Sequence, residues 1–134
     1  MAKIIDIEGI GPAFAEKLTA AGIKTTESLL KAGASPAGRK DIASRSGIDD
    51  RKILEWVNRS DLMRIRGVGS EYSDLLESAG VDTVKELATR RADNLHAKML
   101  EVNAAKKLVR RPPTLSAVES WVANAKTLPP AVTY

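Results

Sequence analysis

The sequence has no cysteine, one histidine (His96) and few aromatic residues, which make up 4% of its 134 residues. Without Cys, a structural zinc site, an iron–sulfur cluster and a Cys nucleophile are excluded, and a Ser-His-Asp triad would have to use His96. We therefore predict no catalytic residue, no metal site and no cofactor. A reducing, cytoplasmic location is the default expectation for a chain in which we expect neither a membrane span nor a secretory signal.

Long apolar runs are missing as well. No segment reaches the roughly 18 apolar residues of a membrane span, and the start, Met1-Ala2-Lys3-Ile4-Ile5-Asp6, meets an acid before a signal-peptide core can form. We expect neither a membrane span nor a secretory signal. The 21 Lys and Arg against 17 Asp and Glu give a net charge of +4, which permits binding to a polyanion without requiring it.

An internal repeat organises the chain. Residues 7–30 align without a gap with residues 65–88, at an offset of 58, and eight of these 24 positions are identical. This similarity predicts a duplication and two units, residues 1–58 and 59–134. Trp121 matches Trp56 at an offset of 65, so the second unit carries seven extra residues, which we place near 110–114.

Helix stop and start signals recur in both halves. Gly22 and Gly80 are predicted to be the left-handed residues that end a helix. Thr83 and Glu86 have the spacing of a capping box, whereas Thr25 has only Ser28 at the corresponding place. The residues predicted to cap helix starts are Thr25, Ser35, Asp49, Thr83 and Thr114.

The fold class predicted from these signals is all-α. Only residues 3–7 offer a short alternative β pattern. Leu128-Pro129-Pro130 should end the last helix and leave an extended tail to Tyr134.

Two segments with alternating Gly resemble the helix-hairpin-helix motif, apolar-x-x-apolar-x-Gly-apolar-Gly-x-x-x-Ala-x-x-apolar. The first copy has Ile4, Ile7, Gly9, Ile10, Gly11, Ala15 and Leu18. The second has Leu62, Ile65, Gly67, Val68, Gly69 and Leu76, with Ser73 in place of Ala. The whole chain also resembles a bacterial family of unknown function with two such motifs and extra helices. These resemblances imply two tandem helix-hairpin-helix units with additional short helices.

The helix-hairpin-helix resemblance implies binding to double-stranded DNA across the minor groove, through phosphates and largely without sequence preference. It also allows a monovalent cation on the hairpin carbonyls. The residues supply a physical reason, because amides without a nearby Cβ at a helix start can approach an anion closely. The candidate phosphate-binding residues are Gly9, Ile10 and Gly11 in the first hairpin, and Arg64, Arg66, Gly67, Val68 and Gly69 in the second.

The two hairpins differ in charge. DNA-binding hairpins usually carry Lys or Arg two residues after the last Gly, where this chain has Ala13 and Glu71. The first hairpin also carries Asp6 and Glu8, which repel phosphate. If only one hairpin binds phosphate, we expect it to be the second.

Further basic residues are candidates for additional contacts: Arg59, Lys106, Lys107, Arg110 and Arg111. The last four have the spacing of one stripe on the final turns of a helix, which is either a solvated face or a second phosphate track.

Several alternatives remain open from the sequence. Asp6, Glu8, Ala13 and Glu71 favour a protein-interaction adaptor that keeps the hairpin fold without binding DNA. Residues 42–53 have helix-turn-helix spacing, although Asp49-Asp50 would repel phosphate there.

The two Trp residues are predicted to fill the core beneath each hairpin, with base stacking as the alternative. Asp93 could be compared with a glycosylase Asp, but such enzymes need a base-sized pocket and a longer chain.

Overall fold

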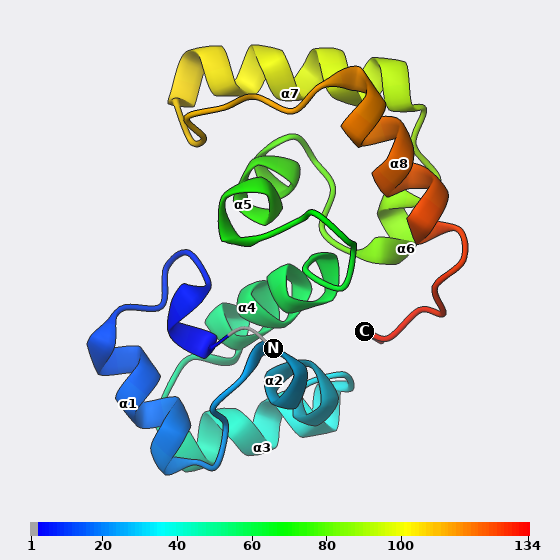
Figure 1. Cartoon of the computed structure of the whole chain (residues 1–134). Coiled ribbons are helices and arrows are strands. Elements are labelled where there is room, and N and C mark those ends of the chain that lie inside the picture. Colours follow the sequence, from blue (N-terminus) through cyan, green and yellow to red (C-terminus); the bar gives the residue numbers. More distant parts are fainter. Residues whose placement is uncertain (1–2) are drawn as a thin grey trace. The chain divides into compact units, whose positions relative to one another are not determined.

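All regular secondary structure in residues 3–134, the part of the chain that the computed structural model describes, is helical (Figure 1). The elements are the 3-10 helix η1 (Ile4–Asp6), α1 (Pro12–Ala20), α2 (Thr26–Ala32), α3 (Pro36–Ser46), α4 (Asp50–Leu62), α5 (Ser70–Ser78), α6 (Val84–Leu87), α7 (Ala92–Lys106) and α8 (Leu115–Ala125). The predicted all-α class is confirmed, and the alternative β pattern is reduced to one isolated bridge between Lys3 and Thr25. Within the same residues, no helix is both long and apolar enough to cross a membrane.

Helices α1 and α5 end in the way that their glycines predict. Gly22 has φ +87° and Gly80 has φ +95°. The Ile23 N–H donates to the Leu18 carbonyl oxygen at 2.9 Å, and the Gly22 N–H donates to that of Thr19 at 3.0 Å. This pair of bonds is the Schellman arrangement, which satisfies carbonyls that the helix itself leaves open.

The predicted N-cap residues cap their helices, but the capping box forms in the first half and not, as predicted, in the second. Thr25 and Ser28 make a complete box, in which the Ser28 N–H donates to Thr25 Oγ1 and the Thr25 N–H to Ser28 Oγ, both at 3.1 Å. The capping box predicted for Thr83 is wrong. Thr83 Oγ1 accepts from the Glu86 N–H at 3.3 Å, but the Glu86 carboxylate pairs with Arg90 at 2.7 Å. A charged partner one turn later competes with the weaker bond to the cap amide.

The chain divides into two units, one formed by residues up to Asp61 together with Ala131–Tyr134, the other by Leu62–Pro130. The sequence placed the boundary after residue 58 and assigned the tail to the second unit. The connection between α7 and α8 spans residues 107–114, whereas that between α3 and α4 spans only 47–49. Much of the extra length of the second unit therefore lies in this loop.

Each unit has its own apolar core. In the first, α1 packs against η1 and α3, and α2 packs against α3. In the second, α7 packs against α5 and α8, and α6 packs against α8 (Figure 1). The largest fully buried side chains are Ile7, Leu18, Leu29, Ile42, Ile53 and Val57 in the first unit, and Leu62, Ile65, Leu75, Leu76, Leu87 and Met99 in the second.

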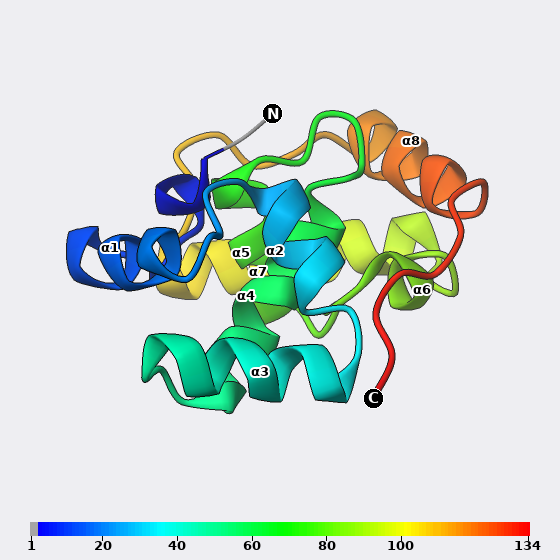
Figure 2. The same cartoon turned by 90° about the horizontal axis from the view of Figure 1, so that it is seen from below.

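The tail belongs to the first unit because Arg39 holds it there. Arg39 is only 6% exposed. Its Nη1 donates to the carbonyl oxygens of Gly33 and Ala34, and its Nη2 to that of Thr133 at 2.8 Å. The Thr133 N–H also donates to the Ala34 carbonyl at 2.8 Å, so the tail ends beside the turn between α2 and α3 (Figure 2). The charge of this buried guanidinium is met by backbone carbonyls.

Candidate nucleic-acid interface

The turn before α5 is closed by one backbone hydrogen bond and leaves the following amides open. Gly67 has φ +91°, which L side chains rarely adopt, and the Val68 N–H donates to the Ile65 carbonyl at 3.0 Å. Gly69 is the N-cap of α5, with an ordinary φ of −103°. The first helical bond runs from Ser73 to the Gly69 carbonyl, so the amides of residues 69–72 have no acceptor among residues 3–134.

The turn before α1 has the same backbone geometry. Gly9 has φ +92° and the Ile10 N–H donates to the Ile7 carbonyl at 3.1 Å. Gly11 is the N-cap of α1, but Pro12 is the first helical residue. Because proline has no N–H, this turn presents one donor fewer than the turn before α5.

The amides of Ile10 and Val68 are not available to a ligand, which corrects the prediction that named them as phosphate contacts. Each is used to close its own turn, and their side chains are only 4% and 5% exposed. The amides left at the second turn are those of Gly67, Gly69 and the first residues of α5, for which no acceptor lies among residues 3–134.

A pocket of about 470 Å³ lies at the second turn. Its lining combines the turn and the start of α5 with two residues from the loop between α7 and α8: Gly67, Gly69, Ser70, Glu71, Tyr72, Arg110 and Arg111. The structure therefore brings Arg110 and Arg111 to the glycines, although they lie about 40 residues further along the chain. Sequence reasoning did not find Ser70 and Tyr72, because no motif links them to the loop.

Three side chains hold this loop in place. Asn103, in α7, makes two bonds with Val109: its Nδ2 donates to the carbonyl at 3.2 Å, and its Oδ1 accepts from the N–H at 2.9 Å. The Tyr72 hydroxyl donates to the Arg111 carbonyl at 2.9 Å. His96 Nε2 lies 2.9 Å from the Pro113 carbonyl oxygen. These contacts use the loop backbone and leave the guanidiniums of Arg110 and Arg111 without an acceptor in residues 3–134.

The predicted basic stripe on a helix is wrong. Helix α7 ends at Lys106, and Lys107 is its left-handed C-cap with φ +52°. Arg110 and Arg111 follow in the loop, so the four cations do not share a helix face. Lys106 and Lys107 are exposed but do not line the pocket.

The other basic candidates have different surroundings. Arg66 is exposed, and its backbone N–H donates to Asn124 Oδ1 at 3.3 Å. Arg64 is half-buried, with Nη2 bonded to the Pro129 carbonyl at 2.9 Å. Arg59 does not fit the role of a surface contact, because it is 8% exposed and bonded to the Glu8 carbonyl and the Glu55 carboxylate. Because Glu8 belongs to the turn before α1, this hydrogen bond from Arg59 stabilises that turn.

Asp93 lines a second pocket, of about 630 Å³, with Arg90 and Arg91. The hydrogen bond from the Asn94 N–H, helped by the charge of Arg91, lowers the pKa of Asp93. A carboxylate with a lowered pKa is a weaker general base. The side chain stabilises the first turn of α7.

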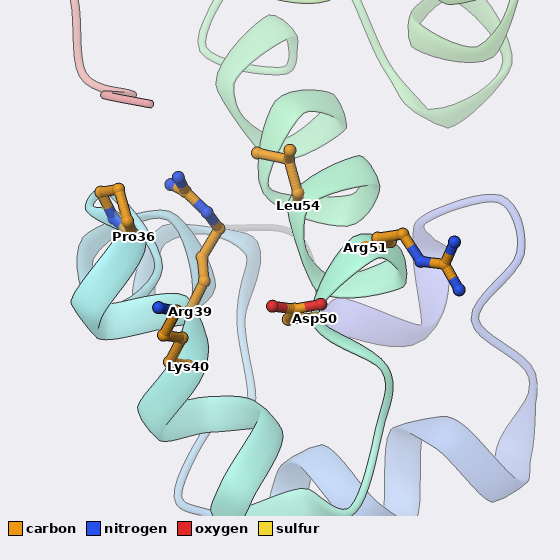
Figure 3. A pocket seen from close by; sticks show the side chains of 6 residues that line it. All are labelled: Pro36, Arg39, Lys40, Asp50, Arg51 and Leu54. Carbon is orange, nitrogen blue, oxygen red and sulfur yellow. The ribbon is translucent and has the colours of Figure 1, made fainter.

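A third pocket, of about 180 Å³, lies in the first unit between α3 and α4. It is lined by Pro36, Arg39, Lys40, Asp50, Arg51 and Leu54. Figure 3 shows Arg51 directed away from the other five side chains. Arg51 instead bonds Asp49 and lowers the pKa of that carboxyl to about 2. At neutral pH Asp49 is therefore ionised and paired with Arg51, the first basic residue of α4, which does not suit a DNA recognition helix starting here.

Both tryptophans are buried, Trp56 at 2% and Trp121 at 4% exposed. Their burial does not fit the alternative in which the rings stack on bases.

The comparison with known protein families matches residues 8–128 to the family described as Domain of unknown function (DUF4332). The chain belongs to this family. The DUF4332 match covers both turns, the pocket and the loop between α7 and α8, so the family unit comprises both structural units. No solved structure matches this DUF4332 chain.

Proposed function

We propose that this DUF4332 protein binds double-stranded DNA without catalysis and largely without sequence preference, using the second of two helix-hairpin-helix motifs. The observation that carries the proposal is the pocket at Gly67 and Gly69. It places helix-start amides with no acceptor and two guanidiniums with no partner among the described residues around one space. Both groups are donors that suit a phosphate oxygen.

Each group has a distinct role in this proposal. The amides of residues 69–71 bind one phosphate, aided by the positive end of α5. Arg110 and Arg111 bind the same or the adjacent phosphate, and exposed Arg66 adds charge nearby along the chain. All the contacts proposed here are with phosphates, which carry no sequence information, so sequence preference should be weak.

The first prediction is a salt dependence that matches three phosphate contacts. With Arg66, Arg110 and Arg111 engaged, the logarithm of the association constant should fall with a slope of about −2.7 against the logarithm of salt concentration. A fourfold rise in salt then weakens binding about 40-fold. Fluorescence anisotropy with two labelled duplexes of different sequence measures both properties. No binding at low salt would overturn the proposal, and so would a large difference between the duplexes.

The second prediction uses the N-cap glycines. Neither Gly69 nor Gly11 requires glycine for its backbone, and a Cβ at either would meet no atom within 4 Å. Gly69→Ala should therefore change the free energy of unfolding by less than about 1 kcal/mol. It should still weaken DNA binding about fivefold, because the methyl group covers amides that must approach phosphate.

Gly11→Ala is the matched comparison, since it makes the same change at the turn flanked by Asp6 and Glu8. We expect a smaller loss of affinity there. Equal losses in the two variants would assign phosphate binding to both turns and contradict the preference for the second.

A protein-interaction adaptor is the second candidate, favoured by Glu71. This exposed carboxylate lines the same pocket as Arg110 and Arg111. A pocket with charges of both signs suits a protein surface better than a polyanion. Absence of DNA binding at low salt in the anisotropy experiment would favour this function.

A further inference from the structure

The indole nitrogen of Trp121 lies directly against Gly67. Among residues 3–134, and apart from the chain neighbours of Gly67, Nε1 is the only heavy atom within 4 Å of the place where a Cβ at Gly67 would stand, at 3.2 Å. The indole N–H donates to no acceptor in residues 3–134. Every fully buried side-chain nitrogen or oxygen in residues 3–134 has a hydrogen-bond partner. An indole nitrogen without a partner must therefore be partly accessible to solvent. Only 4% of Trp121 is exposed, but its indole nitrogen is not fully buried, so the N–H is reachable from outside.

The position of this nitrogen is fixed by aromatic packing. The Tyr72 ring packs on Trp121 with centroids 5.1 Å apart and planes at 53°. Tyr72 also lines the pocket and bonds the loop that carries Arg111. The indole orientation is therefore set by the same residue that positions the basic loop.

The first turn repeats the arrangement. Trp56 Nε1 lies 3.5 Å from the place of a Cβ at Gly9, and Phe14 packs on Trp56 with centroids 5.1 Å apart. Phe14 has no hydroxyl, however, and the sequence there carries Asp6 and Glu8. The two turns thus share the indole donor and differ in the charge around it.

We infer that the Trp121 indole N–H is a direct hydrogen-bond donor to a phosphodiester oxygen bound at the second turn. This inference rests on the proposed function. Because Gly67 has no Cβ, no side chain at position 67 covers the indole nitrogen, which leaves its N–H open to a ligand oxygen on that side. Gly67 lines the pocket, so a ligand bound there lies beside the residue that the indole nitrogen is packed against. A buried indole usually has a partner for its N–H, and the ligand supplies it here.

The test combines a direct probe of the indole protons with a variant that removes one of them. In the wild-type protein, ¹⁵N–¹H NMR resolves one indole signal for each of Trp56 and Trp121. Titration with a short duplex should move the Trp121 indole proton downfield and leave the Trp56 proton nearly unchanged. Trp121→Phe, which keeps an aromatic ring beside Tyr72, should raise the Kd about tenfold. Trp56→Phe is the matched control and should change the Kd less than twofold.

The outcomes separate this inference from the proposed function. If the wild-type protein binds the duplex but the Trp121 indole proton does not shift, the inference is wrong and the proposed function stands. The same conclusion follows if folded Trp121→Phe binds as tightly as the wild type. If the protein binds no duplex, both fail, and an indole shift caused only by an acidic peptide would indicate the adaptor. The wild-type titration keeps the test decisive even if Trp121→Phe does not fold.

Discussion

Replacing Arg110 and Arg111 together with glutamine should raise the Kd for duplex DNA about 30-fold, at roughly 1 kcal/mol for each contact. The slope of the salt dependence should fall by about 2 at the same time, because two phosphate contacts are lost. The fold should be unaffected. The loop is held through its backbone by Asn103, Tyr72 and His96, and neither guanidinium takes part in that support.

The control for this pair is Lys85→Gln with Lys98→Gln. It removes the same net charge from the same unit, and neither lysine lines the pocket. Anisotropy at two salt concentrations measures both double variants. If the lysine variant loses as much affinity as the arginine variant, binding reports net charge alone and the pocket is not the phosphate site.

Gly38→Ala should lower the free energy of unfolding of the first unit by about 3 kcal/mol, the upper end of the range for overpacking. Gly38 lies in the first turn of α3, where propensity alone would favour alanine by about 1 kcal/mol. A Cβ at this position would stand 2.0 Å from the carbonyl oxygen of Ala32 and 3.3 Å from Ser35 Oγ. The Gly38 amide also donates to Ser35 Oγ at 3.1 Å, so relief of the clash would disturb the helix cap.

Urea unfolding followed by Trp56 fluorescence, in a Trp121→Phe background, measures this effect in the first unit alone. Gly11→Ala provides the comparison, since it adds a methyl group in the same unit with no atom within 4 Å. We expect its midpoint to move far less. A stabilised Gly38→Ala protein would show that the turn between α2 and α3 can widen at little cost.

The features that sequence reasoning predicted well are those set within a few residues. The left-handed Gly22 and Gly80, and the caps Thr25, Ser35 and Thr114, depend on hydrogen bonds to residues at most five positions away. Even so, the wrong capping box at Glu86 shows the limit of local reasoning. Arg90, one turn further on, binds the carboxylate more strongly than the cap amide does.

The errors in the basic residues of the candidate site have one physical origin. The stripe from Lys106 to Arg111 assumed that α7 continued, but the helix stops at Lys106 and the loop folds back to Tyr72. Likewise, Arg59 was expected at the surface, but its guanidinium lies beneath the first turn on the Glu8 carbonyl. In both cases a cation's neighbours are set by the path of the chain and not by its spacing from other cations.

The helical class and the two turns before α1 and α5 follow from residue types alone, because Gly, Pro, Thr and Ser act on backbone torsions and hydrogen bonds within one turn of chain. Which groups meet at those turns depends instead on how distant parts of the chain pack together. Arg110 and Arg111 reach Gly67 and Gly69 through a loop held by Asn103, and Trp121 comes to Gly67 from α8. These contacts join residues about 40 to 54 positions apart, where packing and loop closure, not local propensity, determine the neighbours.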